Sequence, residues 1–152
     1  MKLKQVKFWA DNQAVFDHLY QTFVVERAPY NFLNDIPVYI PVAGAQGCAI
    51  GNLLTIQHAW ALHKLSKQYM ALEDIELVLT KPPVINDNIR IIQRIFSNVD
   101  VAFLSDVQRC HDSRNLRETT FISLSDYYDL TYRGVRQKIK IPKWEDLWKN
   151  AT

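Results

Sequence analysis

Cysteine is scarce in this chain: only Cys48 and Cys110 occur among its 152 residues. Two cysteines are too few for the disulfide framework of a small secreted domain, and neither belongs to a Cys-x-x-Cys or Cys/His metal-ligand pattern. No stretch approaches the run of roughly 18 apolar residues typical of a membrane-spanning helix. The first residues also lack the apolar centre of a secretory signal. We therefore expect free thiols, a cytoplasmic location and no membrane partner.

Glycine is also scarce, at four residues, and no Gly- or Ser-rich linker or internal repeat divides the chain. Hydrophobic residues make up 48% of the sequence and charged residues 22%, proportions typical of a globular protein rather than a disordered one. The length suits a domain of ordinary size. We predict a single helical domain over residues 1–152.

The periodicity of apolar residues predicts a mainly α fold. Residues 12–27 place apolar side chains three and four positions apart behind a cap at Asp11 or Asn12, and a further helix is expected from about residue 55 to 69. Residues 29–47 differ because prolines, which lack a backbone donor, interrupt a β-branched run. There we predict a minor extended or β-hairpin element, at about residues 36–46, within an otherwise compact helical domain.

The segment Ala45–Gly51 contains the first candidate for chemistry. Cys48 follows Gly47 at the expected start of a helix, where free amides favour the reactive thiolate. Gln46 lies two residues earlier, and its amide can donate to an oxyanion. The alternative is a small buried side chain between two glycines that permit close backbone approach.

His111 and Asp112 are the second candidate, near the end of a later helix. A helix C-terminus favours a charged imidazole, and a carboxylate can orient the ring. However, adjacent residues on a helix point about 100° apart, so we expect Asp112 to be poorly placed to hold its own neighbour. A thiol and an imidazole that meet in space form an activated nucleophile–base pair, and their separation in sequence leaves this open.

Neither a metal nor a cofactor is predicted. His58 and His63 are five positions apart, which is unsuited to a zinc pair on one helix face. Phosphate-loop, dinucleotide-loop, Gly-x-Ser-x-Gly and His-Glu-x-x-His patterns do not occur in the sequence.

Two short blocks, Cys48–Leu54 (Cys-Ala-Ile-Gly-Asn-Leu-Leu) and Val107–Asp112 (Val-Gln-Arg-Cys-His-Asp), carry a resemblance. They resemble a group of small uncharacterised bacterial and phage proteins in which a Cys-Ala-(Ile/Val)-Gly-x-Leu block precedes a Leu-Gln-x-x-His-Asp block. The chain departs from that pattern at residues 55–58, where a Pro-Asp loop is usual. The resemblance implies a small helical protein of phage or mobile-element type and supplies no reaction.

Three functional hypotheses follow. The favoured one is a binding or interaction protein with an unknown protein partner, in which Trp144 and Trp148 dock on the body or on that partner. The second is a cysteine-dependent hydrolase or transferase with Cys48 as nucleophile, His111 as base and Gln46 as oxyanion donor. The third is nucleic-acid contact through the basic, aromatic-containing C-terminal tail at residues 131–152.

Overall fold

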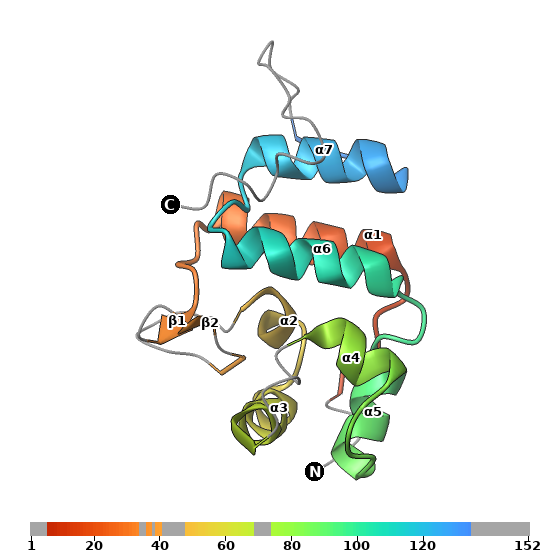
Figure 1. Ribbon diagram of the computed structural model, residues 1–152. Coiled ribbons are helices and arrows are strands. Elements are labelled where there is room, and N and C mark those ends of the chain that lie inside the picture. Colours follow the sequence, from red (N-terminus) through yellow and green to blue (C-terminus); the bar gives the residue numbers. More distant parts are fainter. Residues whose placement is uncertain (1–5, 34–35, 38, 41–47, 69–73, 135–152) are drawn as a thin grey trace.

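The computed structural model describes residues 6–33, 36–37, 39–40, 48–68 and 74–134 (Figure 1). Within these ranges seven α-helices account for most of the ordered backbone, so the mainly α prediction is confirmed. A π-helical turn, η2 (Gln21–Val25), extends the first helix directly. The α-helices, in chain order, are α1 (Asn12–Tyr20), α2 (Ala49–Asn52), α3 (Ile56–Gln68), α4 (Ile75–Thr80), α5 (Asp87–Ile95), α6 (Val101–Asp112) and α7 (Glu118–Tyr128).

The prediction of an extended or hairpin element at residues 36–46 is wrong as placed. Of its described residues, 36–37 and 39–40, only β2 (Ile36–Pro37) has strand conformation, and it pairs antiparallel with the earlier β1 (Phe32–Leu33) through two residue pairs. Residues 38 and 41–46 lie outside the described residues. The β-branched run indicated strand backbone correctly at Ile36 and Pro37 but not at Tyr39 and Ile40, and it did not indicate the partner strand, because pairing depends on the turn between the strands.

The first helix follows its sequence signals closely. Asp11 caps α1 by accepting a hydrogen bond of 2.9 Å from the Ala14 amide, as predicted. The continuous helix ends at Val25, and Arg27 then adopts a left-handed conformation with φ of 53°. The predicted end at residue 27 was therefore two residues too late, within the usual uncertainty of helix ends.

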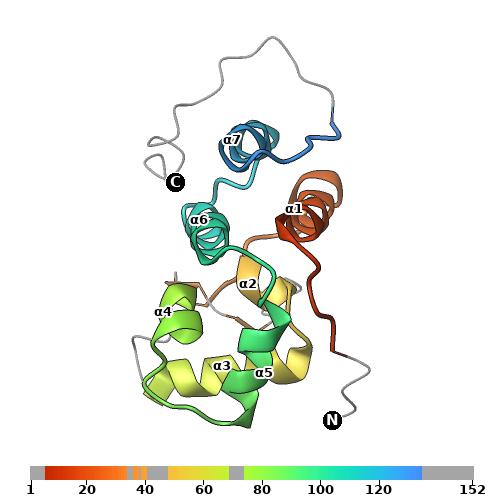
Figure 2. The ribbon, with the colours of Figure 1, turned by 90° about the vertical axis from the view of Figure 1, so that its right-hand side faces the viewer.

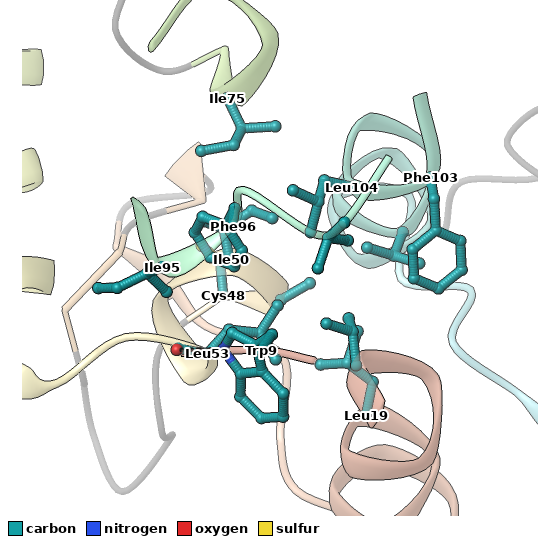
Figure 3. Packing of buried hydrophobic residues seen from close by; sticks show 14 of the residues in the cluster. Trp9, Leu19, Cys48, Ile50, Leu53, Ile75, Ile95, Phe96, Phe103 and Leu104 are labelled. Atoms are coloured by element: carbon teal, nitrogen blue, oxygen red, sulfur yellow. Dashed lines mark hydrogen bonds between the residues drawn. The ribbon is translucent and has the colours of Figure 1, made fainter. Parts of the chain in front are cut away.

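Helices α1, α6 and α7 run side by side (Figures 1 and 2). Helices α2, α3, α4 and α5 lie beyond α1 and α6, on the side opposite α7. Apolar side chains from both groups meet in one buried cluster (Figure 3). Phe16 of α1 packs edge-on against Phe121 of α7, with ring centroids 5.3 Å apart. Among the described residues, no helix is long and apolar enough to cross a membrane.

Candidate functional site: a buried polar network beside α6

Cys48 occupies the N-cap of α2, which is the helix start that the sequence indicated. Its thiol sulfur accepts a hydrogen bond from the Gly51 amide at 3.4 Å, and the residue is 1% exposed. Figure 3 shows Cys48 among the buried hydrophobic residues of the cluster. Burial raises the pKa of the Cys48 thiol to about 12, outweighing the opposite effect of the Gly51 amide. The expectation that the helix start favours the thiolate is therefore wrong, because a four-residue helix inside an apolar core gives less than desolvation costs.

Position 51 has no room for a side chain, which explains why it is a glycine. A Cβ added there would overlap the carbonyl oxygen of Tyr39 and lie 2.8 Å from its carbonyl carbon. The backbone at Tyr39 and Ile40 thus lies directly on α2, and both of these side chains are buried. Close backbone approach, one of the two interpretations of the Cys48 block, is what Gly51 provides.

His111 is fully buried near the end of α6, and both of its ring nitrogens are engaged. The backbone amide of Asn31 donates to Nε2 at 3.2 Å, and Nδ1 lies 3.0 Å from Oδ1 of Asp112. Because a backbone amide can only donate, Nε2 must carry the lone pair, and Nδ1 carries the proton that Asp112 accepts. The expectation that Asp112 is poorly placed to hold its neighbour is wrong. The carboxylate, on the last residue of the helix, still reaches the adjacent ring.

Gln108 joins this network to α2. Its carbonyl oxygen accepts from the Ile50 amide at 3.0 Å, and its amide nitrogen donates to Asp112 Oδ1 at 2.8 Å. One carboxylate oxygen therefore holds both His111 and Gln108. Sequence reasoning did not select Gln108 as a site residue, although its spacing of four from Asp112 puts both on one face of a helix.

Asn31 is the other residue that sequence reasoning missed. It is completely buried, its amide nitrogen donates to the Ile40 carbonyl, and its backbone amide binds His111. The rings of Phe23 and Tyr30 pack edge-on against the His111 ring, with centroids 5.7 and 5.4 Å away. The imidazole is thus held by hydrogen bonds to both of its nitrogens and by edge-on contacts with two aromatic rings.

The network limits what Cys48 and His111 can do chemically. The charge of Asp112 raises the pKa of the Cys48 thiol, and a hydrogen bond with Gln108 lowers it. The His111 ring binds Asp112, so the thiol and the imidazole lie at two ends of one polar network. A general base, however, needs a free lone pair directed at the proton that it takes. The lone pair of His111 is held by Asn31, so this geometry favours a structural role for both residues. Gln46 lies outside the described residues.

The polar network opens to solvent through Asp112, whose side chain is 35% exposed. Asp112 and Gln108 line a pocket of about 360 Å³ between α4 and α6. The other lining residues are Asp74, Ile75, Glu76, Ser105, Arg109 and Ser113. Among the described residues, no group of three or more His, Cys, Asp or Glu side chains is arranged to hold a metal ion.

A second pocket, of about 410 Å³, lies on the outer face of α3, and its lining is different. It is lined by Trp60, His63, Lys64 and Lys67, together with Gln57 and Ala61. Trp60 is 52% exposed, and its ring stands edge-on to the buried ring of His63, with centroids 5.8 Å apart. Burial, helped by Lys67, lowers the pKa of His63, so this imidazole is neutral at pH 7.

The first residues of the basic tail lie against the body. The Tyr132 hydroxyl donates to a carboxylate oxygen of Glu118, and Arg133 pairs with Asp17 at 3.2 Å. The Tyr132 ring also packs edge-on against Tyr20. Two of the tail side chains that could contact a nucleic acid are therefore engaged within the chain, while residues 135–152, including Trp144 and Trp148, lie outside the described residues.

A scan against models of protein families, a search of curated proteins and a search of solved structures each found no match to this chain. The resemblance to small bacterial and phage proteins therefore stays a prediction.

Proposed function

We propose that this chain is a small interaction protein that binds a protein partner through the outer face of α3. The observation that carries the proposal is the exposure of two large apolar side chains one helical turn apart, Ile56 at 63% and Trp60 at 52%. Such side chains cost free energy in water, and exposed tryptophan is a frequent anchor at protein interfaces. The phage or mobile-element origin and the cytoplasmic location remain predictions from the sequence.

The edge-on contact with His63 supports this role for Trp60. A side chain held in one orientation before binding loses less conformational entropy when a partner arrives. The pocket beside Trp60 gives a partner side chain a concavity to fill. An anchor next to a pocket is the arrangement found at the centre of many interfaces.

The cysteine-dependent hydrolase or transferase is the less supported alternative. A nucleophilic cysteine has a lowered pKa and is accessible to substrate, whereas the pKa of Cys48 is raised and the residue is buried. Nucleic-acid contact through the tail is also less supported, since Tyr132 and Arg133 have carboxylate partners within the chain.

A selection experiment tests the proposal. The full chain is used as bait for a random linear peptide library displayed on phage, in parallel with the variants Trp60→Ala and Tyr127→Ala. Tyr127 is a matched control because it is a comparably exposed aromatic residue on α7, at the opposite end of the molecule (Figure 1).

We expect peptides that bind the wild type and Tyr127→Ala but bind Trp60→Ala about 30-fold more weakly, as for an interface hot spot of about 2 kcal/mol. If no enriched peptide depends on Trp60, α3 is not a protein-binding face and the proposal is wrong.

A further inference from the structure

The charges on the outer face of α3 have one sign. Its sequence, from Ile56 to Gln68, contains Lys64 and Lys67 but neither aspartate nor glutamate. Both lysines line the pocket beside Trp60. In the part of the chain that the structure describes, neither of them forms an ion pair, whereas Arg90 pairs with Asp87 and Arg133 pairs with Asp17.

Apolar and cationic side chains are also separated along the helix. Ile56 and Trp60 occupy its first half, and Lys64 and Lys67 follow one and two turns further on. A partner that lies along this face therefore meets an apolar anchor site at one end and two ammonium groups at the other. Since His63 is neutral at pH 7, the lysines provide the positive charge of the pocket.

From this separation we infer that the partner of α3 is an acidic, amphipathic protein segment, with a large apolar residue followed or preceded by carboxylates about one turn away. The inference rests on the proposed function, because it names the chemistry of the partner at the same face. Apolar contact with Trp60 supplies most of the affinity, and the carboxylates supply orientation and a faster encounter with Lys64 and Lys67.

A second copy of the chain fits this face less well. In a two-fold symmetric contact the same patch is present on both subunits, so four lysines would gather in one interface without a carboxylate from α3 to offset them. Like charges placed together in this way oppose association.

The test uses the peptides recovered by selection on the full chain. We expect them to be enriched in Asp and Glu beside Trp, Phe or Leu. A fluorescently labelled example should bind Lys64→Gln/Lys67→Gln about tenfold more weakly than the wild type, because two surface charge pairs are lost. Replacing the carboxylates of the peptide by amides should weaken binding to the wild type similarly and have little further effect on the double variant.

Salt and a control variant sharpen the result. Binding should weaken between about 0.01 M and about 0.15 M salt, as the screening length falls from about 30 to about 8 Å. Lys81→Gln is the matched control, since Lys81 is an exposed lysine at the end of α4 outside the pocket, and it should bind like the wild type. Circular dichroism of each variant checks that it is folded.

The alternative outcomes are distinct. Peptides that require Trp60 but are neutral or basic overturn the acidic-partner inference and leave α3 as a protein-binding face. Failure to recover any Trp60-dependent peptide contradicts the proposed function itself. Binding of a labelled single-stranded oligonucleotide that is lost in both Trp60→Ala and the double lysine variant would assign this face to nucleic acid instead, by base stacking and phosphate contact.

Discussion

His111 and His63 belong to two regions of the molecule that use the same side chain differently. Around His111, polar groups bind one another: Asn31 and Asp112 bind the ring, and Gln108 binds Asp112. On α3, His63 supports a half-exposed tryptophan, and the neighbouring lysines have no ion pair within the described residues. A buried polar network whose groups are hydrogen-bonded to one another stabilises one fold. A partly exposed apolar side chain among charges of one sign is suited instead to binding another protein.

At neutral pH, the largest expected effect comes from breaking the network. His111→Ala leaves the Asn31 amide without its acceptor and opens a space beside Phe23 and Tyr30. We expect the free energy of unfolding to fall by about 3 kcal/mol, from the lost hydrogen bonds and the cavity together. Urea denaturation followed by circular dichroism measures it. A loss below about 1 kcal/mol would show that the network contributes little to stability.

The thiols give a pH-dependent test of the same region. Burial raises the pKa of Cys48 and of Cys110 to about 12, against an ordinary value of 9.0. Above about pH 9 the unfolded chain loses these protons while the folded chain keeps them. Stability should therefore decrease as pH rises from about 9 toward 12, by up to about 1.4 kcal/mol per pH unit for each thiol.

The rate of alkylation of Cys48 tests the same raised pKa. At pH 8 the native thiol should react with iodoacetamide at least about a hundredfold more slowly than in denaturant, because reaction requires an accessible thiolate. Peptide mapping by mass spectrometry separates Cys48 from Cys110. Rapid labelling of native Cys48 with an apparent pKa below about 8.5 would instead favour the cysteine-dependent hydrolase or transferase.

The smallest effect on stability is expected on α3. Trp60→Ala removes a side chain that is about half exposed, so the free energy of unfolding should change by less than about 1 kcal/mol. The same variant should lose most of its peptide binding, and this contrast distinguishes a binding residue from a structural one. A stability loss as large as that of His111→Ala would mean that Trp60 mainly holds the fold together.

Local features of the fold were predictable where local physics controls them. The cap at Asp11, the first helix and the helix beginning after Thr55 all follow from hydrogen-bonding side chains and apolar spacing within a few residues. The partner of β2 was not predictable in this way, because the strand pairs with residues that precede the predicted element.

In the candidate site, too, local features were predictable from the sequence and long-range contacts were not. The sequence located Cys48 at a helix start correctly and offered burial as the alternative to reactivity, but the choice between them depends on packing against elements far along the chain. The donor to His111 is the backbone amide of Asn31, 80 residues away, and a backbone amide has no sequence signature. Gln108 was missed although its spacing from Asp112 is local, because its second partner, the Ile50 amide, is 58 residues away.

The brevity of α2 determines when it can form. A helix of four residues does not nucleate by itself in water, since fixing its first turn costs more conformational entropy than one hydrogen bond returns. The Ile50 amide finds its side-chain acceptor only once α6 has supplied Gln108. We therefore expect α2 to form after α6, although it precedes α6 in the chain, so the segment from Cys48 to Leu53 should become structured late.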